Sequence, residues 1–234
     1  MSNSKAESES EAERLQRLLF EKLFHACMNS DFEGVKRLIK LGADVNRGRP
    51  EDGATSLIIA SRIGHIAVVR LFVKSGADIN MATNTGCTPL YIASLNGHIQ
   101  VVPFLVSSNA DVNMADNNGC TPLLIASQEG HLEIVQLLVK SNADINHDNT
   151  KGVTSLMVAS TNDHLEIVNL LLRNHAEVNK VAQNGCTSLH YACNNGHLDV
   201  VMTLIDAKAN LFLKNIYGYT PLGAAKTDEI RQYI

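Results

Sequence analysis

The sequence predicts an all-α solenoid in which antiparallel helix pairs stack side by side and hairpin loops project from one edge. Three observations indicate this fold. The chain repeats with a period of about 33 residues, and each unit carries start and stop signals for two short helices. The third observation is that no unit can bury its own apolar faces. Such repeats are stable only where neighbours cover one another, so the fold is a linear array.

The unit at residues 116–148 shows these signals most clearly. Thr121 can accept the first free N–H groups of a helix, and Pro122 suits its first position. Gly130 suits the left-handed conformation that ends a helix. From His131 onward, apolar residues recur at helical spacing over so wide an arc that this second helix must be buried on more than one side. Asn142, a residue type that tolerates the left-handed region, ends this second helix. A polar hairpin then leads to the next unit.

Four columns of equivalent residues run through the chain, with one extra residue inserted between Asn46 and Thr55. The columns are Thr55, Thr88, Thr121, Thr154, Thr187 and Thr220; Ala60, Ala93, Ala126, Ala159, Ala192 and Ala225; His65, His98, His131, His164 and His197; and Asn46, Asn80, Asn113, Asn146 and Asn179. Chance does not align so many positions, so the units are true structural repeats.

These columns resemble the ankyrin repeat, whose unit carries Thr-Pro-Leu-His, a Gly-His between its helices and a Gly-Ala-Asp-Val-Asn exit. The resemblance rests on Thr88–Leu90, Thr121–Leu123, Thr220–Leu222, the Gly-His pairs at 64, 97, 130 and 196, and Gly76–Asn80, and it covers roughly residues 20 to 234. It implies an ankyrin-repeat solenoid of L-shaped units with projecting β-hairpin loops. It also implies a non-enzymatic protein–protein interaction module.

The chain divides into a tail and one repeat domain. Residues 1–13 are polar and acidic and are expected to form a disordered tail. Residues 14–234 form the ankyrin repeat domain, with repeats at 14–48, 49–81, 82–115, 116–148, 149–181, 182–214 and 215–234. We expect seven helix pairs, with atypical first and last units acting as caps. The alternative is that the chain is a fragment of a longer array.

The first and last units carry the atypical signals. Ser10 and Glu13 have the spacing of a capping box, which predicts a long first helix from near Glu11 to Ala26. The last unit lacks the Gly-His and about three residues, while Ile230, Tyr233 and Ile234 keep an apolar face.

Composition excludes several functional classes. A formal net charge of −4 argues against a nucleic-acid binder. No segment resembles a signal peptide or is apolar for the 18 or so residues of a membrane span. The five cysteines are odd in number and form no Cys-x-x-Cys, which indicates reduced thiols. We therefore expect an intracellular, cytoplasmic protein that binds no membrane.

The histidine column does not predict a metal site. Equivalent histidines lie one repeat apart, about 10 Å, whereas zinc needs nitrogens within about 2.1 Å of one centre. We expect structural histidines, each bonded to the backbone of the turn that it follows. The sequence also has no phosphate loop, nucleophile elbow, His-Glu-x-x-His helix or paired carboxylates. It predicts no enzyme, no cofactor and no small-molecule substrate.

Four residues depart from the repeat pattern. Pro103 falls within a second helix, where an interior proline costs about 3 kcal/mol and kinks the helix. The alternative is a tolerated kink near the first turn. Asp163 replaces the glycine between two helices and must adopt a conformation that costs a non-Gly residue about 1 to 2 kcal/mol. His175 and Lys208 stand where Gly76 closes the second repeat. These repeats are expected to fray locally.

The resemblance also places a partner-binding surface, because similar arrays use the hairpin tips and the exposed face of the first helices. The residues that map to the helix face, called the concave strip below, are Arg62, Ile63, Leu95, Asn96, Gln128, Glu129, Thr161, Asn162, Asn194 and Asn195. The strip is amide-rich and suits hydrogen bonding to an extended segment or a loop of a partner, with Leu95 as the expected apolar anchor. A rival site is the group Ile216, Tyr217 and Tyr219.

The hairpin tips map to Glu51–Asp52, Asn84–Thr85, Asn117–Asn118, Thr150–Lys151, Gln183–Asn184 and Ile216–Tyr217. For these tips, partner binding and simple turn chemistry remain equally open, because Asn and Thr are also the residues that turns favour.

Similar ankyrin loops are substrates of an asparaginyl hydroxylase that recognises Leu eight residues before the target Asn and an acidic residue two before it. Asn46, Asn113, Asn146 and Asn179 keep this spacing and are possible hydroxylation sites. The alternative is that these Leu and Asp residues only serve the core and the hairpin.

The sequence does not name a partner. Three readings stay open beside the interaction module: a substrate-recruiting adaptor, a fragment of a larger ankyrin-containing enzyme complex, and a secreted effector that acts inside another cell.

Overall fold

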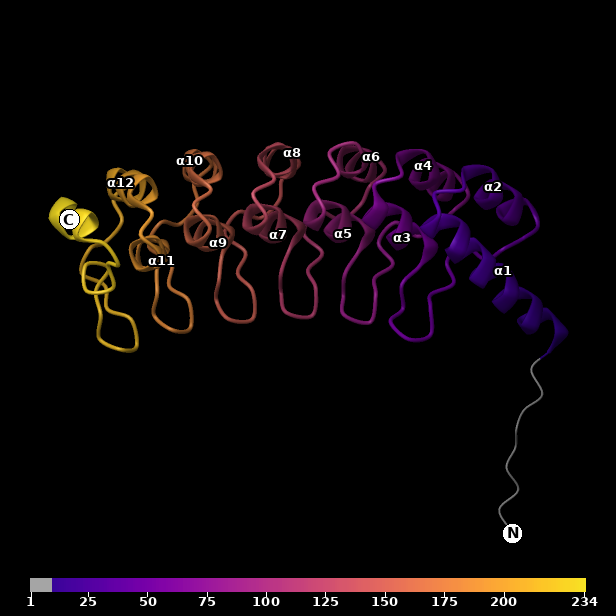
Figure 1. Ribbon diagram of the computed structural model, residues 1–234, viewed down its shortest axis with the longest axis horizontal. Coiled ribbons are helices and arrows are strands. Elements are labelled where there is room, and N and C mark those ends of the chain that lie inside the picture. Colours follow the sequence, from indigo (N-terminus) through magenta and orange to yellow (C-terminus); the bar gives the residue numbers. More distant parts are fainter. Residues whose placement is uncertain (1–9) are drawn as a thin grey trace, which may run out of the picture.

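The computed structural model describes residues 10–234, which form a curved row of six antiparallel helix pairs and one last helix. The helices are α1 (Glu11–Met28) with α2 (Phe32–Lys40), α3 (Ser56–Ile63) with α4 (Ile66–Lys74), α5 (Pro89–Leu95) with α6 (Val101–Ser107), α7 (Pro122–Gln128) with α8 (Leu132–Lys140), α9 (Ser155–Thr161) with α10 (Leu165–Arg173), α11 (Ser188–Asn195) with α12 (Leu198–Asp206), and α13 (Asp228–Tyr233). In Figure 1 the second helices follow the outer side of the arc, and the hairpin loops project from its inner side.

The first helix begins inside the range predicted as a tail. Ser10 accepts the N–H of Glu13 through its side chain (3.2 Å) and Glu13 accepts the N–H of Ser10 (3.0 Å), so the predicted capping box is present. Helix α1 therefore starts at Glu11 and ends at Met28, two residues after the predicted end. The rest of the predicted tail lies outside the described residues.

The first helices of the inner repeats begin as the sequence predicts. In five repeats the threonine side chain accepts the backbone N–H three residues later; the pairs are Thr55 and Ile58 (3.3 Å), Thr88 and Tyr91 (3.1 Å), Thr121 and Leu124 (3.2 Å), Thr154 and Met157 (3.3 Å), and Thr187 and His190 (3.4 Å). Pro89 and Pro122 occupy first-turn positions, where no N–H is needed.

One hydrophobic core runs through the whole row of helix pairs, both within each pair and between neighbouring pairs. Leu90, Leu123, Leu156 and Leu189 are almost completely buried, and so is the alanine column next to them. Burying one such leucine contributes about 1.5–3 kcal/mol relative to leaving it exposed. Each repeat therefore depends on both neighbours, as the sequence predicts.

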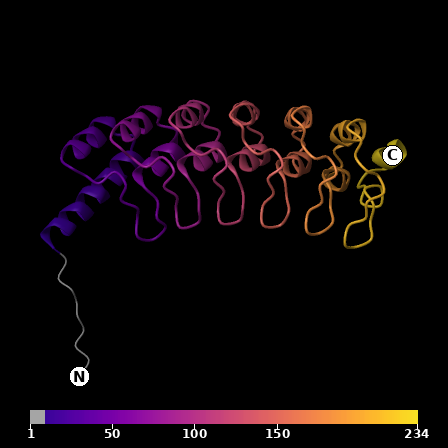
Figure 2. The same ribbon diagram turned by 180° about the vertical axis from the view of Figure 1, so that it is seen from behind.

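The projecting loops are hairpins without strands. In residues 10–234 only isolated bridges occur, between Gly48 and Thr55 and between Asp148 and Thr154. Neighbouring hairpins are joined tip to tip by backbone hydrogen bonds, from Asn84 N to Asp52 O (2.8 Å), Asn117 N to Thr85 O (2.9 Å), Thr150 N to Asn118 O (2.8 Å), Gln183 N to Lys151 O (2.9 Å) and Ile216 N to Asn184 O (3.0 Å). The row of hairpins, also visible from behind in Figure 2, is thus one continuous edge.

The seventh unit differs from the prediction of a seventh helix pair. Its first helix is reduced to a turn over 221–224, in which Ala224 N donates to Thr220 O (3.0 Å). Only α13 follows, and it holds to the array through Ile230, which is fully buried. The prediction of seven pairs is wrong because the shortened unit has too few residues left for two helices and the turn that joins them.

The position of Pro103 agrees with the first-turn alternative that the sequence left open. Helix α6 begins at Val101, three residues after its histidine, whereas α8 begins at Leu132, directly after His131. Pro103 therefore lies in the first turn, where backbone N–H groups have no partner within the helix. Asp163 has a φ of 61°, which confirms its predicted left-handed conformation, and His175 and Lys208 have the same conformation with φ values of 67° each.

Candidate functional site

The histidine column links each repeat to the one before it. The contacts run from His65 Nε2 to Ser30 O (3.3 Å), His98 to Arg62 O (2.7 Å), His131 to Leu95 O (3.1 Å), His164 to Gln128 O (3.0 Å) and His197 to Thr161 O (3.0 Å). The sequence predicts that each histidine bonds to the backbone of the turn that it follows, and this prediction of the acceptor is wrong. The carbonyl lies at the end of the preceding first helix, so the histidines fix the helix ends that carry the concave strip.

The close approach of neighbouring repeats also explains why glycine is favoured at position 97 of the Gly-His pairs. A Cβ on Gly97, which has a φ of 71°, would lie 2.6 Å from the ring of His131 in the next repeat. Glycine suits both this backbone conformation and this close approach, whereas Asp163 takes the same left-handed conformation at the equivalent position with a side chain that has to lie beside His197.

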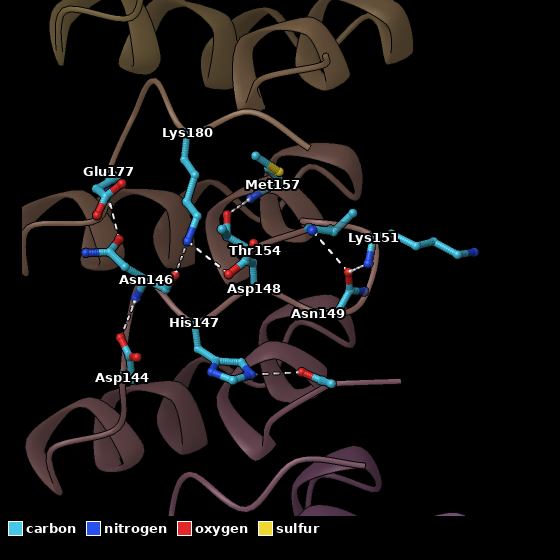
Figure 3. Close-up of polar contacts among 12 residues, drawn as sticks. Asp144, Asn146, His147, Asp148, Asn149, Lys151, Thr154, Met157, Glu177 and Lys180 are labelled. Carbon is cyan, nitrogen blue, oxygen red and sulfur yellow. Dashed lines mark hydrogen bonds and ion pairs between the residues drawn. The ribbon is translucent and has the colours of Figure 1, made fainter. Parts of the chain in front are cut away.

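The asparagine column makes a second set of links. Asn146 accepts the N–H of Glu177 (2.8 Å) and donates to His175 O (3.3 Å). Figure 3 shows its side chain directed at the following repeat, beside Lys180, which donates to Asn146 O (2.7 Å). Asn46, Asn80, Asn113 and Asn179 accept equivalent N–H groups from Asp78 (2.7 Å), Asp111 (2.9 Å), Asp144 (2.8 Å) and Asn210 (2.7 Å). All four predicted hydroxylation sites therefore have a structural role.

The residues of the concave strip lie at the ends of the first helices, as expected from the register. The exposed members are Arg62, Ile63, Asn96, Gln128, Glu129, Asn162 and Asn194, and the half-buried members are Leu95, Thr161 and Asn195. Several polar side chains are held by their own helix: Asn96 donates to Ile92 O (2.8 Å), Asn195 to Tyr191 O (2.9 Å) and Thr161 to Met157 O (2.8 Å). These groups are fixed before any partner arrives.

Four strip residues meet at one depression, the central depression. It has a volume of about 570 Å³ and is lined by Gln128, Glu129, Val158, Thr161, Asn162 and His164. Asn162 donates to Gln128 O (3.1 Å) across the repeat boundary, which fixes its amide at the edge. Leu95 does not line this depression. Val158 was missed by the sequence reasoning, although it lies four residues before Asn162 and so on the same helix face.

A second depression, the tyrosine hollow, lies at the C-terminal end of the strip. Its volume is about 430 Å³, and its lining residues are Asn184, Cys186, His190, Tyr191, Asn194, Asn215, Tyr217, Tyr219, Gly223 and Ala224. The strip residue Asn194 therefore shares one hollow with Tyr217 and Tyr219 of the rival site. The two sites were predicted as separate because the sequence does not show that this hairpin lies against α11.

A third depression, the arginine pocket, was not predicted at all. It has a volume of about 390 Å³ between α1 and the first hairpin and is lined by Arg17, Phe20, Glu21, Phe24, His25, Arg47, Arg49, Pro50 and Glu51. The guanidinium of Arg49 lies 5.0 Å from the centre of the Phe24 ring and forms an ion pair with Asp52. The hydrogen bond from Arg49 lowers the pKa of Asp52 to about 2.

Burial sets the protonation of two kinds of side chain near the strip. His190 is buried, and this burial lowers its pKa. Its Nδ1 accepts the N–H of Thr187 (3.1 Å) and its Nε2 lies 3.1 Å from Tyr219 O, to which it donates. Burial also raises the pKa of the Cys27 and Cys193 thiols to about 12, so these two thiols stay protonated.

Two side-chain amides at the hairpin tips form hydrogen bonds to the neighbouring hairpin. Asn117 donates to Asn84 O (3.0 Å) and Gln183 to Thr150 O (2.7 Å), each in the preceding hairpin. This pattern favours a structural role for these two side chains. Within residues 10–234, no three His, Cys, Asp or Glu side chains are grouped as metal ligands would be, and no helix is long and apolar enough to cross a membrane.

Comparison with known proteins identifies the repeats. A family model described as ankyrin repeats (3 copies) matches residues 23–116, 108–182 and 156–232. The crystal structure of the human ASB11 ankyrin repeat domain is similar over 90% of this chain and 94% of that one, with 29% sequence identity and a TM-score of 0.81. The ankyrin repeat-containing protein YIL001W of Saccharomyces cerevisiae is 39% identical over 66 residues, which are 28% of this chain and 13% of the yeast protein.

Ankyrin repeats are in general protein–protein interaction modules and are typically not catalytic. The family model extends over most of the chain, and the helix pairs, hairpins and repeat links agree with it. The chain belongs to the ankyrin repeat family.

Proposed function

We propose that the chain is a non-enzymatic binding module that takes an extended segment of a partner protein along the concave strip. The observation that carries this proposal is the central depression of about 570 Å³, because it brings Gln128, Glu129, Thr161 and Asn162 together on the exposed ends of two first helices. The repeat register in the sequence predicts all four of these positions.

The chemistry of the central depression suits the backbone of an extended segment. Asn162 uses its amide NH₂ on Gln128 O (3.1 Å), which leaves its carbonyl oxygen as an acceptor. Gln128 donates to the Glu129 carboxylate (3.0 Å), and both side chains are exposed. Polar groups that are already held in place lose little conformational entropy when a partner binds, so they support affinity as well as orientation.

Leu95 is the proposed apolar anchor beside the depression. It is half-buried, and its own carbonyl is tied to His131 (3.1 Å), so the backbone that presents it is fixed. Binding energy concentrates in a few well-packed residues, and apolar residues are sparse on this strip. Removing its side chain therefore removes partner contact rather than the backbone link between repeats.

The test has two steps: capture of a partner by the intact chain, then measurement of its affinity for single variants. We expect Leu95→Ala to cost about 1 to 2 kcal/mol and Glu129→Ala less than about 1 kcal/mol, because an exposed rim charge stays screened by water and salt. Gln128→Ala should fall between them. Lys140→Ala, an exposed position on the outer helix α8, serves as the control. Loss of affinity with Lys140→Ala and none with the strip variants would reject the proposal.

We further propose that the module works in a reducing, cytoplasmic compartment, which the five free cysteines support. An adaptor that recruits substrates, a part of a larger enzyme complex and a secreted effector are the finer alternatives. Each alternative predicts a different observation. An adaptor should co-purify with an enzyme, a part of a larger enzyme complex should have a reading frame that continues into a non-repeat domain, and a secreted effector should bind a protein of another cell.

We propose hydroxylation at Asn46, Asn113, Asn146 and Asn179, and their hydrogen bonds support an order of reactivity among them. Asn113 is exposed, and its side chain only accepts from Asp144 N (2.8 Å), whereas Asn46, Asn146 and Asn179 also donate to a carbonyl (3.3 Å each). We expect Asn113 to react first, because fewer contacts must open. Mass spectrometry after incubation with an asparaginyl hydroxylase decides it: no gain of one oxygen on any of the four asparagines rejects the hypothesis.

A further inference from the structure

Equivalent positions of the repeats can be compared with one another, and three residues that line the tyrosine hollow differ from their equivalents in the other repeats. Equivalent positions share one backbone, so a side chain found at one position of one repeat only is specific to that place in the array. Tyr191 replaces Ile59, Ile92, Ile125 and Val158; Tyr217 replaces Asp52, Thr85, Asn118, Lys151 and Asn184; and Tyr219 replaces Ala54, Cys87, Cys120, Val153 and Cys186. Three of the five tyrosines in the chain thus line one hollow.

The hollow is built before any ligand binds. Asn215 accepts the N–H groups of Tyr217 (3.0 Å) and Tyr219 (3.1 Å) through its side chain, and His190 donates to Tyr219 O (3.1 Å). The Tyr191 hydroxyl lies 3.2 Å from the Asn184 amide nitrogen, which donates to it. The backbone under the rings is therefore fixed, while the side chains of Tyr217 and Tyr219 stay accessible: these residues are 74% and 56% exposed.

The lining offers aromatic faces and hydrogen-bond donors but no charge. None of its ten residues is acidic, lysine or arginine, and its histidine is buried with a lowered pKa. Among the described residues, the hydroxyls of Tyr217 and Tyr219 and the amide of Asn194 have no hydrogen-bond partner. These free polar groups of the hollow can all donate hydrogen bonds.

A proline-containing segment matches these features. In the polyproline II conformation it presents apolar rings and backbone carbonyls, and proline has no N–H that needs an acceptor. Aromatic-lined grooves bind such segments because the ligand is extended before binding and loses little entropy. The rings would pack on the tyrosines, and the carbonyls would accept from the free hydroxyls and from Asn194.

A cationic side chain is the main competitor, because aromatic faces also attract Lys and Arg. The lining opposes it, because no carboxylate lines the hollow. A cation that enters here would lose water and find no counter-charge among the lining residues.

We propose that the tyrosine hollow binds a proline-containing extended segment of the partner in the polyproline II conformation. This inference rests on the proposed function and specifies the chemistry of the partner at the C-terminal end of the strip.

The test titrates blocked synthetic peptides into the full chain: decaproline, a Gly-Ser peptide of the same length, and a Gly-Lys peptide of the same length. The chain has no Trp, so its intrinsic fluorescence comes mainly from the five tyrosines and reports on the hollow. We expect a saturable change with decaproline only. The double variant Tyr217→Ser/Tyr219→Ser should bind it about tenfold more weakly or worse, a factor that corresponds to about 1.4 kcal/mol.

Tyr233→Ser is the matched control, because Tyr233 is 44% exposed on α13 and does not line the hollow. It should bind decaproline like the unchanged chain. Circular dichroism of all variants checks that each is folded. No saturable binding of decaproline, equal binding by the double variant, or preferred binding of the Gly-Lys peptide would each overturn the proposal.

The two proposals fail in different ways. If decaproline does not bind but a captured partner still loses affinity with Leu95→Ala, only the proline assignment is wrong. If decaproline binds the hollow but the captured partner is insensitive to every strip variant, the concave-strip proposal is wrong.

Discussion

At the N-terminal end of the array, Gln16 of α1 donates to Gly42 O (2.9 Å) and accepts the N–H of Asp44 (3.1 Å), the two bonds that Asn146 makes to the next repeat in the interior. At the C-terminal end, the position equivalent to Asn179 is Phe212, which is 82% exposed. A turn also replaces the first helix of that last unit. One end satisfies its outermost backbone groups with a helix side chain, whereas the other presents aromatic side chains.

This difference shows how one repeat pattern yields two kinds of end. The longer α1 supplies polar partners that a preceding repeat would otherwise supply, so the described N-terminal unit is held by hydrogen bonds as well as by its core. The last unit relies on a small apolar contact, centred on Ile230 and Ala225. Regions with few buried contacts open first, so we expect the last unit, which supplies Tyr217 and Tyr219 of the tyrosine hollow, to be the least stable described part of the array.

Removal of the C-terminal contact should have the largest effect. Ile230→Ala leaves a cavity at a fully buried site, and such changes typically cost about 2–5 kcal/mol. We expect hydrogen exchange to accelerate in 215–234 and to stay unchanged in α7 and α8. Equal acceleration in α7 and α8 would show that the last unit does not open separately.

The two polar links should contribute similar amounts to stability. Gln16 and Asn146 are both half-buried, and the backbone groups that they bind belong to exposed residues. Gln16→Ala and Asn146→Ala should therefore each lower the free energy of unfolding by about 1 kcal/mol, because water can replace the lost bonds. Urea denaturation measures both values. A cost for Gln16→Ala well below that for Asn146→Ala would show that Gln16 does not replace the link that joins two repeats.

The C-terminal end should also be the more sensitive to pH. The pKa of His190 is lowered by burial from the ordinary value of 6.5, so the unfolded chain binds this proton more readily than the folded one. The contribution of the neutral His190 ring to the free energy of unfolding is therefore full above pH about 6.5 and declines as the pH falls below that value. His190→Gln should reduce the slope of unfolding free energy against pH between pH 7 and 5. An unchanged slope would exclude this group as the cause.

The smallest effect is expected at Pro103. It lies in the first turn of α6, so Pro103→Gln should raise the unfolding free energy by less than about 1 kcal/mol instead of the roughly 3 kcal/mol of an interior proline. Hydrogen exchange over residues 98–108 should be faster than over 131–141 in the unchanged chain. If both segments exchange equally slowly, Pro103 creates no weak point.

The local features of the fold could be predicted from sequence because their causes are local. Thr121 caps a helix and Asp163 takes a positive φ for reasons contained within a few residues. The acceptor of His131 could not be predicted, because Leu95 O lies in another repeat. The tyrosine hollow could not be predicted for the same reason. Tyr191 and Tyr217 come from different units, and only the stacking of these units places them together.

Crosslinking from the two sides of one repeat tests most directly whether the partner lies on the concave strip. A photoreactive benzoylphenylalanine placed at Gln128, at the end of α7, is compared with one placed at Lys140, on the outer helix α8; both positions are exposed. Irradiation with a captured partner should give a covalent adduct from position 128 and none from position 140. An adduct from position 140 alone would place the partner on the outer side and contradict the account.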